Sequence, residues 1–76
     1  MLTLRRGTVA VAESAPVPMQ RLEVELAGER RPAVADVGLV GESEVGDDVV
    51  VNTAALDLGL GSGGFDVVHV NLTRGL

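Results

Sequence analysis

Apolar and polar residues alternate along residues 21–26, whose sequence is Arg-Leu-Glu-Val-Glu-Leu. A period of two places the apolar side chains on one face of an extended chain and indicates a half-buried β-strand. Ala27-Gly28-Glu29 favours a tight turn, so a second strand, around residues 31–37, should pair antiparallel with the first as a hairpin. Pro32 near its beginning suggests an edge position or the start of that strand.

Three further segments favour β-structure. Residues 8–12 (Thr-Val-Ala-Val-Ala) predict a first strand, which begins at Thr8 or as early as Leu2 and ends before the prolines at 16 and 18. Residues 48–52 and 65–72 predict the last two strands. One short helical turn is predicted over residues 53–58, because Asn52 or Thr53 can cap it and Gly59 stops it. The pattern predicts an all-β fold, a small five-stranded barrel of SH3-like or OB-like type with that helical turn before the last strand.

The last two strands are apolar on both faces. Val49-Val50-Val51 and Val67-Val68 are consecutive apolar residues, whereas a solitary small barrel should show one polar face on each strand. Either loops or a partner must cover the outward valines. We expect a partner, which is a second copy in a homodimer or a C-terminal domain outside this chain.

Composition narrows the possible functions. At 76 residues the chain is one small domain, and its only aromatic residue is Phe65, so Val, Leu and Ala must build the core. The net charge of −5 and the lack of stacking aromatic residues argue against nucleic-acid binding, although Arg5-Arg6 and Arg30-Arg31 form two basic pairs. No stretch resembles an export signal or a membrane span, so we expect a cytoplasmic protein that does not bind membranes.

A glycine-rich segment is the main candidate for ligand chemistry. Gly59-Leu-Gly-Ser-Gly-Gly64 contains the spacing G-x-G-x-x-G, but a strand follows it where a dinucleotide site needs a helix. Backbone amides of such a loop can still form an anion-binding nest. The candidate ligand-binding residues are Asn52, Thr53, Asp57, Gly61, Gly63 and Gly64. The competing interpretation is that the polar members cap a helix and bond within turns.

Other polar residues give weaker signals. Four acidic residues gather in one turn, Glu42, Glu44, Asp47 and Asp48, but their spacing does not match an EF-hand, and we expect a solvated acidic turn. His69 has no second His or Cys with which to bind a metal, and strand alternation places it on the same side as Val67 and Asn71. We expect no cofactor, no metal and no catalytic residues.

The sequence also resembles a known group of proteins. Arg6-Gly-Thr-Val9, Val45-Gly-Asp47 and above all residues 52–65 (Asn-Thr-Ala-Ala-Leu-Asp-Leu-Gly-Leu-Gly-Ser-Gly-Gly-Phe) are similar to the N-terminal region of an uncharacterised bacterial family of unknown function. The resemblance implies that the chain is the N-terminal domain of a longer protein, and it implies no activity. Members carry Tyr and His after the glycines, where this chain has Phe65 and Asp66.

Two functions remain open from the sequence. The first is a non-catalytic interaction or structural module that self-associates or docks through its apolar outer strands. The second is an accessory N-terminal domain of a larger enzyme, which contributes the glycine-rich loop to an anion or small-ligand site.

Overall fold

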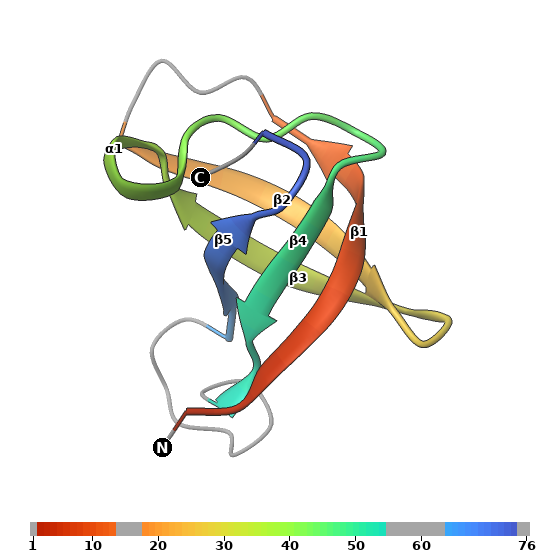
Figure 1. Ribbon diagram of the computed structural model, residues 1–76. Helices are drawn as coiled ribbons and strands as arrows, with labels where there is room; N and C mark the ends of the chain where they lie inside the picture. Colours follow the sequence, from red (N-terminus) through yellow and green to blue (C-terminus); the bar gives the residue numbers. More distant parts are fainter. Residues whose placement is uncertain (1, 14–17, 55–63, 75–76) are drawn as a thin grey trace.

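The computed structural model describes residues 2–13, 18–54 and 64–74 of the chain. In these ranges the chain forms five strands and a short helix (Figure 1). In chain order they are β1 (Leu4–Ala12), β2 (Met19–Leu26), β3 (Glu29–Asp36), α1 (Val37–Val40), β4 (Asp48–Asn52) and β5 (Asp66–Asn71). The prediction of an all-β fold is confirmed.

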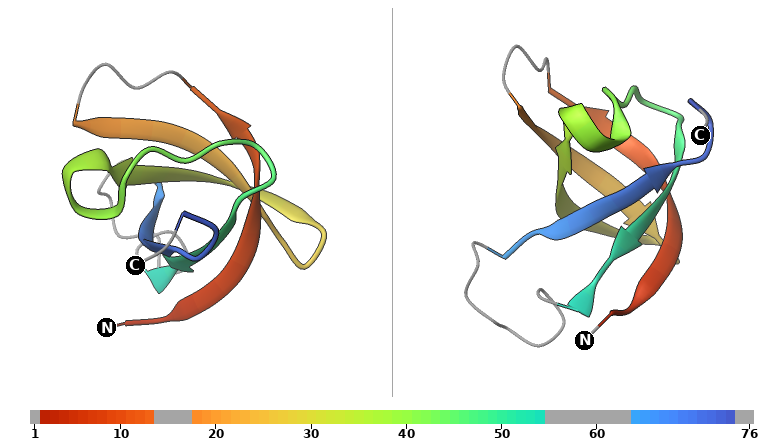
Figure 2. Two further views of the ribbon diagram at one scale, coloured as in Figure 1. Left: turned by 45° about the horizontal axis from the view of Figure 1, so that its top comes forward. Right: turned by 60° about the vertical axis from the view of Figure 1, so that its left-hand side comes forward.

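The strands close into a barrel in the order β1-β2-β3-β5-β4, as the views in Figure 2 show from two further sides. Neighbouring strands run antiparallel except β3 and β5, which are parallel. The long curved β1 completes the closure, because its first half pairs with β4 and its second half pairs with β2. The predicted five-stranded barrel is therefore present, with a mixed sheet.

The β2–β3 hairpin is the clearest agreement between the pattern and the structure. Burial along β2 alternates strictly from Met19 to Leu26, and the two strands pair from Met19–Asp36 to Leu26–Glu29. Ala27 and Gly28 form the turn with φ of 49° and 82°. Positive φ at both turn residues matches the right-handed twist of the flanking strands and favours this hairpin.

The interior contains aliphatic side chains from every strand. Because the chain has a single aromatic residue, small and branched side chains fill the barrel. The hydrophobic core comprises Val9, Leu22, Val24, Leu26, Ala33, Ala35, Val49, Val51 and Val68. Each of them belongs to a strand, and each is at most 4% exposed.

β1 starts at Leu4, inside the interval that the sequence allowed, and it crosses β2 closely at Gly7. A Cβ at Gly7 would collide with Leu26 and lie 2.7 Å from the Glu25 carbonyl oxygen. A bulge between Val9 and Val11 then shifts the pairing with β2. The glycine and the bulge together allow β1 to pair with both β4 and β2.

The short helix begins at Val37, where the sequence predicts the end of a strand. Gly38 and Gly41 mark a break, yet residues 37–40 form α1, because the Asp36 carboxylate accepts a hydrogen bond of 3.0 Å from the Gly38 amide. α1 precedes β4 and lies near the end of the barrel where β1 ends (Figure 1). The helical turn predicted over 53–58 falls almost entirely outside the described residues.

Candidate functional site

Asn52 and Thr53, two of the candidate ligand-binding residues, form side-chain hydrogen bonds with neighbouring backbone groups. The Asn52 Oδ1 accepts hydrogen bonds from the Thr3 amide at 3.2 Å and the Ala54 amide at 3.1 Å. Thr53 is fully buried, and its hydroxyl donates to the Thr3 carbonyl at 3.5 Å. Gly64 has a φ of 71°. These bonds match the capping and turn interpretation; Asp57, Gly61 and Gly63 lie outside the described residues.

A buried polar cluster fills the barrel end near α1. Gln20 exchanges hydrogen bonds with the Ser43 backbone, donating from Nε2 to the carbonyl at 2.9 Å and accepting at Oε1 from the amide at 2.8 Å. Asn71 Nδ2 donates to the Ser43 hydroxyl at 2.9 Å and to Asp47 Oδ2 at 3.0 Å. Among the described residues no buried side-chain nitrogen or oxygen lacks a hydrogen-bond partner. The cluster therefore supports the fold and presents no free buried polar atom to a ligand.

Asp47 corrects the expectation of a fully solvated acidic turn. It is 4% exposed and accepts a 2.8 Å bond from Arg74 Nε. That bond, with help from the Glu44 amide and Asn71, lowers the pKa of Asp47 from 3.8 to about 2 against the opposing effect of burial. Charge-assisted hydrogen bonds to the ionised form explain this direction. Glu42 and Glu44 remain exposed, as expected.

An ion pair with both side chains buried lies inside the barrel. Arg31 Nε and Nη2 donate to the two carboxylate oxygens of Asp66 at 2.6 and 3.0 Å, and the Asp66 side chain is fully buried. Alternation along β3 gives the signal for this pair, because Arg31 shares its face with the buried Ala33 and Ala35. In the sequence, Arg31 and Arg30 stand side by side as one of the two basic pairs. The structure instead pairs Arg30 with Glu23 on the surface.

His69 and Asn71 lie on opposite sides of β5, which corrects the expected alternation. Val70 pairs with Val50 and Val68 pairs with Val51, so His69 is an extra residue in the ladder. This bulge leaves His69 exposed like Val67 but turns Asn71 into the interior, where it is 1% exposed. In the ranges that the structure describes, no group of three His, Cys, Asp or Glu side chains could hold a metal ion.

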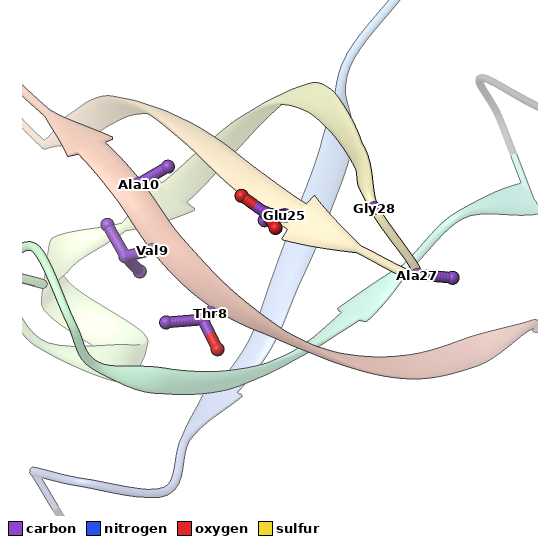
Figure 3. Close-up of a pocket in the computed structure, with 6 residues that line it drawn as sticks. All are labelled: Thr8, Val9, Ala10, Glu25, Ala27 and Gly28. Carbon is purple, nitrogen blue, oxygen red and sulfur yellow. The ribbon is translucent and has the colours of Figure 1, made fainter.

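A surface hollow of about 300 Å³ is lined by residues of β1, of its neighbour β2 and of the turn between β2 and β3 (Figure 3). Its lining consists of Thr8, Val9, Ala10, Glu25, Ala27 and Gly28. One carboxylate and one hydroxyl among small side chains do not bring together a nucleophile, a base and an orienting group. The hollow is therefore not a candidate active site.

Apolar side chains line up across the outside of the barrel and form the candidate interaction surface. The strand register places Leu4 beside Asn52, Asn52 beside Val67, and Val67 beside Val34. Directly opposed residues in a sheet point to the same face, and the alternating neighbours Val51, Val68 and Ala33 are buried, so these four point outward. We call Leu4, Asn52, Val67 and Val34 the outer row.

The outer row is partly open to solvent. Leu4 is 44% exposed and Val67 is 45% exposed, while Val34 is half-buried. Arg21 opposes Val34 at one end of the row, and its guanidinium lies 5.7 Å from the centroid of the Phe65 ring. The expectation of apolar side chains on both faces of β4 and β5 therefore holds at Val67, which is exposed next to the buried Val68.

Comparison with known proteins adds a family but no activity. None of the helices in the described ranges is long and apolar enough to cross a membrane. The chain matches no curated protein and no solved structure. Residues 32–75, more than half of the chain, match the model of a family described as "Protein of unknown function (DUF3866)", and the chain belongs to that uncharacterised family.

Proposed function

We propose that the chain is a non-catalytic protein-interaction module that self-associates through the outer strands carrying the outer row. The observation that supports this most directly is the outer row itself, in which Leu4, Val67 and Val34 lie on three strands outside the hydrophobic core and Asn52 of β4 lies between Leu4 and Val67. None of these three side chains belongs to the hydrophobic core. Full burial of a Leu or Val side chain is worth about 1.5–3 kcal/mol, so covering an exposed member of this row, such as Leu4, favours association.

The topology supports assignment of the barrel to the OB type. The strand order β1-β2-β3-β5-β4, closed between β4 and β1, and the position of α1 between β3 and β4 are features of that fold. Many OB barrels bind single strands with basic grooves and stacking aromatic side chains. Here the net charge is −5, and the single aromatic ring, Phe65, already lies against Arg21. These features favour a protein partner over a nucleic acid.

The alternative is that the chain contributes its glycine-rich segment to a ligand site in a larger enzyme. It gains no support from Asn52 and Thr53, because their side-chain oxygens bond to neighbouring backbone groups. The interaction module therefore accounts better for the described residues.

Paired substitutions test the proposed function. The variant Leu4→Lys/Val67→Lys places two charges on the outer row. The control Leu39→Lys/Val45→Lys makes the same charge change at side chains that are 82% and 65% exposed, on α1 and in the segment before β4. We expect light scattering to give a dimer mass for the wild type and the control and a monomer mass for the outer-row variant. A monomeric wild type, or equal loss of dimer in both variants, would refute the proposal.

A further inference from the structure

Among the described residues, the first half of β1 pairs with another strand along one edge only. β1 pairs with β4 from Leu4 to Thr8, but its pairing with β2 begins only at Thr8. Figures 1 and 2 show that no other described strand lies along the outer side of this segment. An exposed edge presents unpaired backbone groups that can bind another strand. Leu2 and Leu4 in this segment are 63% and 44% exposed, so the edge carries two exposed apolar side chains beside Arg5 and Arg6.

The backbone bonds show which residues face the open edge. The Thr3 carbonyl accepts a 2.8 Å bond from the Thr53 amide, and the Val9 amide donates a 2.9 Å bond to the Asp47 carbonyl, so Thr3 and Val9 direct these groups toward the β4 side. In an antiparallel ladder, successive residues direct both backbone groups to alternate sides. Leu2, Leu4 and Arg6 therefore direct their amides and carbonyls toward the open edge.

We propose that a second copy of this chain pairs with that edge, antiparallel, about a two-fold axis at Leu4. This inference rests on the proposed self-association and specifies where the copies meet. In this register Leu4 opposes the partner's Leu4, and Leu2 opposes the partner's Arg6. Each of these pairs joins residues whose backbone groups face the edge, so each exchanges two hydrogen bonds. The interface is isologous, as a two-fold dimer requires.

Charge selects this register over its neighbours. Arg5 opposes the partner's Thr3, so no arginine lies directly opposite another. A shift of two residues toward the C-terminus would place Arg5 opposite the partner's Arg5, and directly opposed like charges destabilise a strand pair. The opposite shift would leave Arg6 without an opposing residue among those that face the edge. Arg6 also has its own counter-charge, because its Nη2 donates to Asp48 at 3.0 Å.

The proposed pairing also extends the outer row. Within one chain the row runs from Val34 on β3 to Leu4 at the edge of β1. Pairing Leu4 with the partner's Leu4 joins two such rows end to end on one continuous sheet. The two leucines, exposed in the single chain, then cover each other at the axis. The pairing thus explains why an apolar residue stands at the edge position of the row.

Single cysteines test the register, because the chain contains no Cys. Thr3 and the partner's Arg5 form a non-hydrogen-bonded pair with Cα atoms about 4.5 Å apart, within the range of a disulfide. Two copies of Thr3, or two of Arg5, lie on diagonals of about 7–8 Å, beyond easy bridging. We expect a mixture of Thr3→Cys and Arg5→Cys chains to form the mixed disulfide dimer under mild oxidation at a rate at least tenfold above either chain alone. Val45→Cys, exposed but far from the edge, provides the background rate.

Two single lysine variants distinguish an error in the edge pairing from an error in the proposed self-association. We expect Leu4→Lys alone to give a monomer mass and Val67→Lys alone to keep the dimer, with circular dichroism showing that both variants are folded. If Val67→Lys dissociates the dimer and Leu4→Lys does not, the copies meet face to face; self-association then stands and the edge pairing is wrong. Preferential disulfides between two Arg5→Cys chains would likewise overturn the register. A wild-type chain that stays monomeric would refute both the self-association and the edge pairing.

Discussion

Replacing Arg31 by Met should destabilise the protein more than any single change on its surface. The substitution leaves the Asp66 carboxylate, whose side chain is fully buried, without the guanidinium that donates to both of its oxygens. Removing one partner of a buried ion pair costs about 3–5 kcal/mol. At about 0.05–0.15 kcal/mol per residue, a chain of this length has a free energy of unfolding of roughly 4–11 kcal/mol. The variant should therefore lose a large part of its stability.

The matched control is Arg30→Met on the same strand. Arg30 pairs with Glu23 at 3.7 Å, and both side chains are about half exposed. Such surface pairs contribute about 0.2–1 kcal/mol. Urea unfolding followed by far-ultraviolet circular dichroism suits the measurement, because the chain has no Trp or Tyr for fluorescence.

A double variant, Arg31→Met/Asp66→Leu, separates buried charge from lost packing. Replacing a whole buried ion pair by apolar side chains is often neutral or stabilising. We expect the double variant to regain most of the stability that Arg31→Met loses. If Arg31→Met costs no more than Arg30→Met, or if the double variant is as unstable as the single one, the reasoning about buried charge is refuted.

Three further predictions concern single positions. Gly7→Ala should cost about 1–3 kcal/mol, as overpacking does, because its Cβ would lie 2.7 Å from the Glu25 carbonyl oxygen; an unchanged urea midpoint would contradict the close strand crossing. Stability should fall as the pH drops from about 4 to about 2, because Arg74 lowers the pKa of Asp47 from 3.8 to about 2 and the contribution of the ionised carboxylate is lost through that interval. Asp47→Asn should make the loss of stability between these pH values smaller. An equally large loss in the variant would show that other groups cause it. Ala27→Asn should raise the melting temperature, since Asn accepts the φ of 49° more readily than Ala; a lower value would show that Ala27 makes an uncounted contact.

Local patterns predicted the strands well. The period-two alternation of residues 21–26 marked β2, and the apolar run at 48–52 marked β4, which occupies the same residues in the structure. The hairpin followed from two adjacent strands and a short turn. The parallel pairing of β3 with β5 joins segments separated by a long stretch of chain, and no local pattern specifies it.

The buried polar groups were harder to predict from the sequence. Asp47 belongs to an acidic turn whose composition suggests solvent, and its burial depends on Arg74 and Asn71, which arrive from the far end of the chain. Asn71 itself turns inward because of the bulge at His69, which shifts the alternation by one residue. The exposed Leu4 was missed as well, because its exposure follows from β1 passing from one neighbouring strand to another.

Sedimentation of the wild-type chain over a range of concentrations shows whether the chain self-associates. We expect a reversible transition from the 7.8 kDa monomer to a dimer of twice that mass. Leu4→Lys/Val67→Lys should abolish the transition, and Leu39→Lys/Val45→Lys should preserve it. A single monomeric species at every concentration would rule out self-association.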